Sequence, residues 1–206
     1  MQQLHIDIFA DIICPWCFIG KKRLEQAFVK RPHIQPVFHW RSFLLNPSMP
    51  DAGMDRQDYL RAKFGHAANA VYGRIAEAGQ EAGIQFAFDA IGKTPNSRPV
   101  HQLLIAAGNN SFALSEQFYK AYFLDGKDIS DKGLQSELCT EVGLDRIELE
   151  MQQDTSKAQL DADLQQGQNF GIDGVPFMVF QSRFSIAGAH PPDTLLNVID
   201  AAIQDD

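Results

Sequence analysis

The chain has 206 residues, of which 45% are hydrophobic and 15 are phenylalanine, enough for one sizeable domain or a domain with a large insertion, and too apolar for a disordered chain. A formal net charge of −8 argues against nucleic acid or an anionic membrane as the main partner. No apolar stretch approaches the roughly 20 residues that span a bilayer, and the first residues lack the basic and apolar regions of a signal peptide, so we expect a cytoplasmic protein.

The first quarter of the chain predicts a strand, a helix and a second strand. Apolar residues alternate over 4–10, and the segment Cys14-Pro15-Trp16-Cys17 leads into an amphipathic helix that Pro32 ends after about residue 30. Residues 35–43 have strand character. A long helix between two strands implies parallel pairing with a right-handed crossover.

The middle of the chain, from about residue 55 to 170, has helical periodicity. Ser111 and Ser130 are candidate N-caps, with Asp131 adding negative charge at a helix start, and residues 84–89 are ambiguous and could be a short extended piece. The expected helices lie near 56–64, 67–83, 98–108, 113–123, 131–142 and 156–170.

Strand character returns near the end of the chain. Residues 175–180 and 184–187 are separated by three residues, a length that predicts an antiparallel hairpin, and 192–204 predicts a last amphipathic helix. The sequence therefore predicts an α/β fold of βαβ…ββα order with a helical region inserted in the middle.

The pair Cys14 and Cys17 is the strongest chemical signal. A C-x-x-C pair at a helix start suits thiol–disulfide exchange, because the free N–H groups and the dipole favour a thiolate on the first cysteine. We expect Cys14 to be the exposed nucleophile and Cys17, one turn into the helix, to be the more buried thiol that resolves the mixed disulfide.

Two other interpretations of the pair remain open at this point. Zinc needs four ligands, and the remaining cysteine, Cys139, and the histidines lack the required spacing, so we expect no metal. The pair could also be unreactive core cysteines. Cys139 itself lies among Leu134, Leu138 and Val142 at helical spacing, which predicts a buried apolar thiol.

Other residues have both a functional and a structural interpretation. Pro176, after Val175, is either an ordinary proline at a strand start or a cis-proline that leaves Val175 free to pair with an extended substrate. Asp11 either accepts a proton from a thiol or caps its turn. Trp16 lies inside the motif and could be an exposed apolar contact for substrate.

The chain resembles the thioredoxin-like superfamily, and within it the DsbA-like branch of FrnE-type dithiol–disulfide isomerases. The matching segments are 11–20, 40–47, 63–65, 95–97 with His101, 143–145, 174–177 and 188–191. The resemblance implies that Pro176 is cis, that 1–50 and 171–206 form a discontinuous thioredoxin-like domain, and that 51–170 form a helical insertion covering the active site. It also implies that Asn96 and His101 line the substrate pocket, although His101 could equally be a structural histidine.

The sequence departs from the family pattern at three positions near the presumed pocket. Ser97, Val100 and His190 replace the expected Thr, Ala and Gln, which leaves the substrate open. Hydroxychromene-carboxylate isomerases and kappa-class glutathione transferases are similar in fold but have Ser at the first thiol position. An intact Cys14 with Cys17 therefore favours dithiol exchange.

We accordingly predict a thiol–disulfide oxidoreductase or isomerase acting on protein or small-molecule disulfides. It would bind no cofactor beyond its own redox-active disulfide, with glutathione or a thioredoxin-type protein as reductant. The alternatives are a glutathione-dependent isomerase or transferase acting on a small hydrophobic molecule, and a non-catalytic peptide-binding or chaperone module. The direction of exchange does not follow from the sequence, because reduction potentials within this fold vary by about 150 mV.

Overall fold

The computed structural model of the chain describes residues 2–204, and its centre is a four-stranded sheet of order β2-β1-β5-β6. β1 (Gln2–Ala10) pairs in parallel with β2 (Ile34–Ser42) over its whole length, and α1 (Pro15–Val29) makes the crossover. β1 is a central strand, and apolar side chains on both of its faces are covered by the rest of the protein. Leu4 and Ile6 on one face and Phe9 on the other are fully buried. The predicted strand–helix–strand unit is confirmed.

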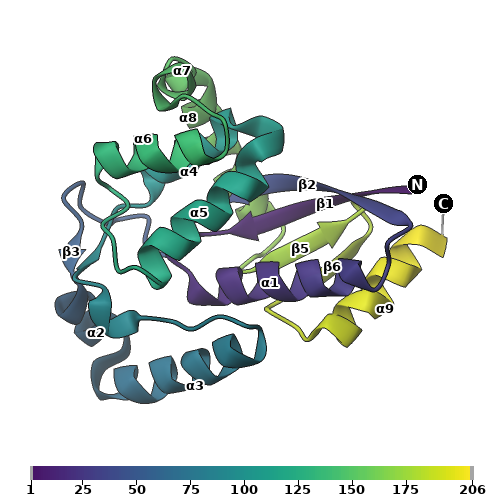
Figure 1. Cartoon of the computed structure of the whole chain (residues 1–206), viewed down its shortest axis with the longest axis horizontal. Coiled ribbons are helices and arrows are strands. Elements are labelled where there is room, and N and C mark those ends of the chain that lie inside the picture. Colours follow the sequence, from purple (N-terminus) through teal and green to yellow (C-terminus); the bar gives the residue numbers. More distant parts are fainter. Residues whose placement is uncertain (1, 205–206) are drawn as a thin grey trace.

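The hairpin predicted near the C-terminus is also confirmed. β5 (Phe177–Phe180) runs antiparallel to β1 and to β6 (Phe184–Ala187), and Gln181 and Ser182 take φ values of 49° and 54° in the turn. β5, the first strand of this hairpin, begins two residues later than expected. α9 (Pro192–Gln204) packs beside α1 on one face of the sheet (Figure 1).

The residues between β2 and β5 are largely helical and gather at the end of the sheet where β1 ends (Figure 1). The domain boundaries after residues 50 and 170 stay a prediction. The helices are α2 (Arg56–Phe64), α3 (Ala68–Glu81), α4 (Arg98–Ala106), α5 (Ser111–Phe123), α6 (Lys132–Glu141), α7 (Arg146–Glu150) and α8 (Gln153–Asn169).

Several local predictions for this region need correction. The short helix α7 and a two-stranded ladder of β3 (Met54–Asp55) and β4 (Lys93–Thr94) were not predicted, because five- and two-residue elements carry too little periodicity. Residues 84–89 form no strand, and Phe88–Ala90 make a 3₁₀ turn. The cap of α6 is Asp131, whose carboxylate accepts from Leu134 N at 2.8 Å, so Ser130 is not the cap. The Ser111 prediction was one residue late, since Asn110 precedes α5 and makes no side-chain cap bond.

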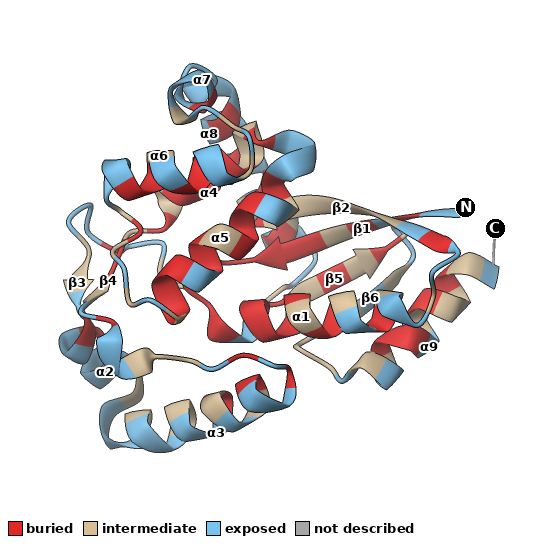
Figure 2. Ribbon diagram, viewed as in Figure 1, coloured by how far each residue is buried: buried red, intermediate tan, exposed pale blue. Residues whose placement is uncertain are grey.

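The inserted helices share a continuous core with the sheet and α1. Phe18 on α1 stacks on Tyr119 of α5, with ring centroids 5.1 Å apart, and Phe123 lies next to both rings. On the same interface Glu116 forms ion pairs with Lys21 at 3.4 Å and Lys22 at 2.6 Å. Figure 2 shows the buried residues running from β1 through α1 into α5, so the helix that carries the dithiol is held from both sides. Between residues 2 and 204 no helix is long and apolar enough to cross a membrane.

Candidate active site

The two cysteines lie at the start of α1, where Pro15 occupies the first helical position. Cys14 is the N-cap residue with extended backbone angles (φ −96°, ψ 111°), and its carbonyl accepts from Cys17 N at 3.1 Å. Proline suits this place because its missing N–H would have no partner in the first turn. Both cysteines are free thiols and both are only 3% exposed. The expectations that Cys14 is exposed and that Cys17 is the more buried of the two are therefore wrong.

The two thiols have equal exposed fractions but differ in their position on α1 and in the groups around them. Burial raises the pKa of Cys17 well above its usual value, and a hydrogen bond with Cys14 and the charge on Cys14 raise it further. Cys14 is instead the N-cap residue of α1, at the positive end of the helix dipole. Cys17 is therefore held as a thiol at neutral pH, while Cys14 occupies the place that favours an anion.

The cis Val175–Pro176 peptide bond lies directly beside the dithiol. The thiol of Cys14 donates to the carbonyl oxygen of Val175 across a Sγ–O distance of 3.6 Å. Gly20, on the face of α1 toward this loop, leaves room for the proline ring: a Cβ there would lie 2.8 Å from Pro176 Cγ and 3.4 Å from Met178 Cε. The predicted cis bond is found, and the structure adds Gly20 as the residue that permits its approach to α1.

Asp11 ties the turn before Cys14 to the rest of the protein. It is fully buried, and its carboxylate accepts from Ile13 N at 3.3 Å and from Leu45 N at 2.8 Å. Its backbone oxygen accepts from Cys14 N at 3.0 Å and from the Tyr119 hydroxyl at 3.3 Å. Asp11 therefore does cap its own turn, as one of the two predicted interpretations requires, and its charge also contributes to the raised pKa of Cys17.

His101 completes the surroundings of Asp11. Its Nε2 lies 3.1 Å from Asp11 Oδ1, and its Nδ1 lies 3.3 Å from Trp40 Nε1 and 3.1 Å from Ser42 Oγ. Because an indole N–H can only donate, we assign Nδ1 as the acceptor and place the ring proton on Nε2, from which it is donated to Asp11. His101 is fully buried, so in this structure it presents no surface to a substrate.

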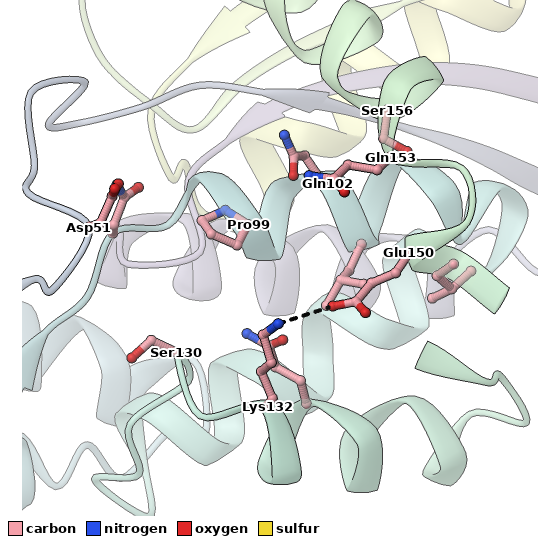
Figure 3. Close-up of a pocket in the computed structure, with 12 residues that line it drawn as sticks. Asp51, Pro99, Gln102, Ser130, Lys132, Glu150, Gln153 and Ser156 are labelled. Atoms are coloured by element: carbon pink, nitrogen blue, oxygen red, sulfur yellow. Dashed lines mark hydrogen bonds and ion pairs between the residues drawn. The ribbon is translucent and has the colours of Figure 1, made fainter. Parts of the chain in front are cut away.

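The other two predicted pocket residues lie in different places. Trp16 is 36% exposed in the middle of the motif, as expected. Asn96 donates to Met49 O at 3.1 Å and accepts from Arg98 N at 3.0 Å, and it lines a cavity of about 380 Å³ between α4 and α6–α8 (Figure 3). Neither cysteine nor Pro176 lines that cavity. Asn96 and the dithiol are thus not brought together.

A second cavity, of about 270 Å³, adjoins the turn that carries Cys14, and sequence reasoning missed it. Its lining residues are Leu45, Asn46, Met54, Tyr59, Ala62 and Lys63. One of its lining residues, Leu45, contacts the turn before Cys14, since Leu45 N donates to the Asp11 carboxylate at 2.8 Å. The i,i+4 spacing of Tyr59 and Lys63 on α2 was the available signal, but nothing local relates α2 to Cys14. Over residues 2–204, no three His, Cys, Asp or Glu side chains are grouped to hold a metal.

The chain resembles several known proteins over most of its length. A probable DsbA oxidoreductase from Streptomyces coelicolor has 26% identity and a TM-score of 0.84, covering 98% of this chain and 91% of that one. The cytosolic disulfide reductase DsbM from Pseudomonas aeruginosa, solved with GSH, has 16% identity and a TM-score of 0.69, covering 97% and 99%. The uncharacterized protein YwbO of Bacillus subtilis (strain 168) is 24% identical over 144 residues, which are 69% of this chain and 68% of YwbO.

A protein-family model also matches the chain. The model of the DSBA-like thioredoxin domain matches residues 5–200, which include most of β1, the other three strands of the central sheet, the dithiol and the helices between β2 and β5. The resemblance inferred from the sequence motifs is therefore confirmed. The chain belongs to the DSBA-like thioredoxin domain family.

Proposed function

We propose that the protein is a cytoplasmic thiol–disulfide oxidoreductase that uses Cys14 as nucleophile and Cys17 as resolving thiol. The observation that carries the proposal is the asymmetry of the pair. Cys14 lies at the N-terminus of α1 against the Val175 carbonyl, whereas burial and its neighbour raise the pKa of Cys17. One thiol is thus suited to attack first and the other to remain protonated until a mixed disulfide has formed.

The reaction has two exchange steps. The Cys14 thiolate attacks one sulfur of the substrate disulfide, a Cys14–substrate disulfide forms, and the other substrate sulfur leaves as a thiolate that takes up a proton. Cys17 then loses its proton and attacks Cys14 Sγ, which releases the second substrate thiol and leaves a Cys14–Cys17 disulfide. Two electrons pass from the dithiol to the substrate, and a thiol reductant such as glutathione returns them. DsbM, solved with GSH, supports glutathione in this role.

The residues around the dithiol have distinct parts in the proposal. Val175 and Pro176, directly beside Cys14, would position the substrate chain, and Trp16 would offer its exposed ring to apolar substrate groups. Asp11, whose charge acts on Cys17, would take the proton that Cys17 loses, and His101 would hold the Asp11 carboxylate in place. The substrate contact predicted for Asn96 would concern a part of the substrate away from the reacting sulfurs.

The test is insulin reduction with glutathione as electron donor. We expect Cys14→Ser to abolish turnover, and Cys17→Ser to stop after one step and accumulate a mixed disulfide that mass spectrometry detects. Equal rates for the wild type and Cys14→Ser would refute the proposal. Turnover of a small hydrophobic substrate that survives Cys17→Ser would indicate the glutathione-dependent isomerase instead, and peptide binding that persists in the double variant without any turnover would indicate a chaperone. A glutathione redox titration of the pair gives the direction of exchange.

A further inference from the structure

The cavity of about 380 Å³ between α4 and α6–α8 is strongly polar and lies outside the dithiol site (Figure 3). Nine of its twelve lining residues are polar or charged, and Pro99, Leu103 and Leu149 supply the apolar part. Its volume falls in the lower part of the range for small-molecule sites, roughly 300–1,000 Å³. Because most such sites are lined predominantly by apolar side chains, this lining favours a small and polar occupant.

Several polar side chains of the cavity have no hydrogen-bond partner in the protein. Ser156 of α8 is 1% exposed, and between residues 2 and 204 no other residue hydrogen-bonds its hydroxyl group. The side-chain amides of Gln102 and Gln153 also make no hydrogen bond within that range. Buried polar groups are normally hydrogen-bonded, since they lose their bonds to water on folding. The partner of Ser156 must therefore come from the contents of the cavity.

Opposite charges lie at separate places around the cavity. Lys132 Nζ is 4.0 Å from Glu150 Oε1, the outer limit of an ion pair, and Glu150 also pairs with Arg146 one helical turn earlier. Asp51 accepts from Asn96 Nδ2 at 3.3 Å, and no cation of the described residues pairs with it. Lys132 is thus available to a carboxylate and Asp51 to an ammonium group, and Figure 3 shows the two side chains apart, with the cavity between them.

The balance of charges excludes other classes of ligand. The lining holds one lysine and two carboxylates, so a phosphate or another multiply charged anion would meet net repulsion. An apolar molecule would leave the unpartnered serine and glutamine groups without hydrogen bonds. A molecule that carries one charge of each sign and hydrogen-bonding groups between them satisfies both conditions.

We propose that this cavity binds a zwitterionic short peptide, such as a free dipeptide, independently of the dithiol. Lys132 binds the peptide carboxylate and Asp51 its ammonium group. The serine and the two glutamines hydrogen-bond the peptide amide, which donates and accepts as the glutamine side chains do. One apolar side chain of the peptide packs on Leu103 and Leu149, which are 4% and 6% exposed.

Isothermal titration calorimetry with alanyl-leucine tests the site. The comparison ligands are N-acetyl-alanyl-leucine, which lacks the ammonium group, and alanyl-leucine amide, which lacks the carboxylate. We expect saturable binding of the free dipeptide. Each blocked form should bind about tenfold more weakly, which is the effect of losing one hydrogen bond to a charged group.

Two variants assign the ends of the peptide. Lys132→Gln should weaken the binding of alanyl-leucine about tenfold and leave that of alanyl-leucine amide unchanged, because the amide has no carboxylate to lose. Asp51→Asn should in the same way affect the free dipeptide and not the N-acetyl form. Lys157→Gln is the matched control, since it removes the same charge from α8 and does not line the cavity. All three side chains are exposed, so the substitutions leave the core intact.

The same titration with the Cys14→Ser/Cys17→Ser variant separates this site from the dithiol. Binding should persist there, because neither cysteine lines the cavity. Each of four results would overturn the proposal: no saturable binding, equal affinities for free and blocked peptides, equal losses in Lys132→Gln and Lys157→Gln, or loss of binding in the double variant. An enzyme that fails to reduce insulin but binds the free dipeptide as expected would refute the proposed function and leave this site standing.

Discussion

Replacing Gly20 by alanine adds one methyl group at the contact between α1 and the loop that faces Cys14. The added Cβ would lie 2.8 Å from Pro176 Cγ, whereas ordinary van der Waals contacts begin at 3.4 Å, so the ring or the helix must move by about 0.6 Å. Both neighbours are constrained, because α1 is packed against α5 and α9, and Pro176 O accepts from Gly188 N at 2.7 Å.

Two opposing effects determine the stability of Gly20→Ala. Alanine in a helix interior is favoured over glycine by about 0.8–1.0 kcal/mol. Overpacking a tight contact costs about 1–3 kcal/mol. The variant should therefore range from unchanged to about 2 kcal/mol less stable. A displaced Pro176 should also lower insulin reduction, by about tenfold or more, since small misplacements at a reaction centre are costly.

Gly73→Ala in α3 is the matched control. Gly73 also lies inside a helix, and its added Cβ would meet nothing within 4 Å. It should gain the full propensity term, about 1 kcal/mol, with unchanged activity. Urea denaturation of both variants isolates the packing term as the difference between them. If Gly20→Ala were as stabilised as Gly73→Ala and equally active, the inferred contact between α1 and Pro176 would be refuted.

Three further predictions concern the two cysteines, His101 and the interface between α1 and α5. At pH 7, native-state alkylation followed by peptide mapping should label Cys14 before Cys17, because burial raises the pKa of Cys17; the reverse order would contradict the assigned roles. His101→Ala removes a donor from a buried carboxylate and should lower the unfolding free energy by about 1–3 kcal/mol; an unchanged urea midpoint would show that the histidine is dispensable. The pKa of Glu116 is lowered from 4.5, because the hydrogen bond from Lys22 and the neighbouring charges outweigh burial, so its stabilisation is present above pH 4.5 and lost as the pH falls through the folded value. The stability advantage of the wild type over Glu116→Gln should therefore stay constant from pH 7 to about pH 4.5 and narrow as the pH falls further, and an advantage that stays constant below pH 4.5 would disprove this origin.

The sequence by itself determined the elements with strong local signals. Periodicity and proline placement predicted α1, the β5–β6 hairpin and α9 with bounds that differ by at most two residues, because each signal lies within the element it describes. The C-x-x-C spacing gave the dithiol in the same way. Elements of two to five residues, namely β3, β4 and α7, were missed because so short a segment has no period.

Only the tertiary structure decided the surroundings of the dithiol. Asp11, Ser42 and His101 come from three separate segments and meet only when α4 packs against β2. Tertiary packing also buried Cys14, which the motif had suggested to be exposed, and placed Tyr59 of α2 at the cavity that Leu45 lines. Hydrogen bonds and burial at a site depend on which distant segments are neighbours in space, and that information is absent from the local pattern of residues.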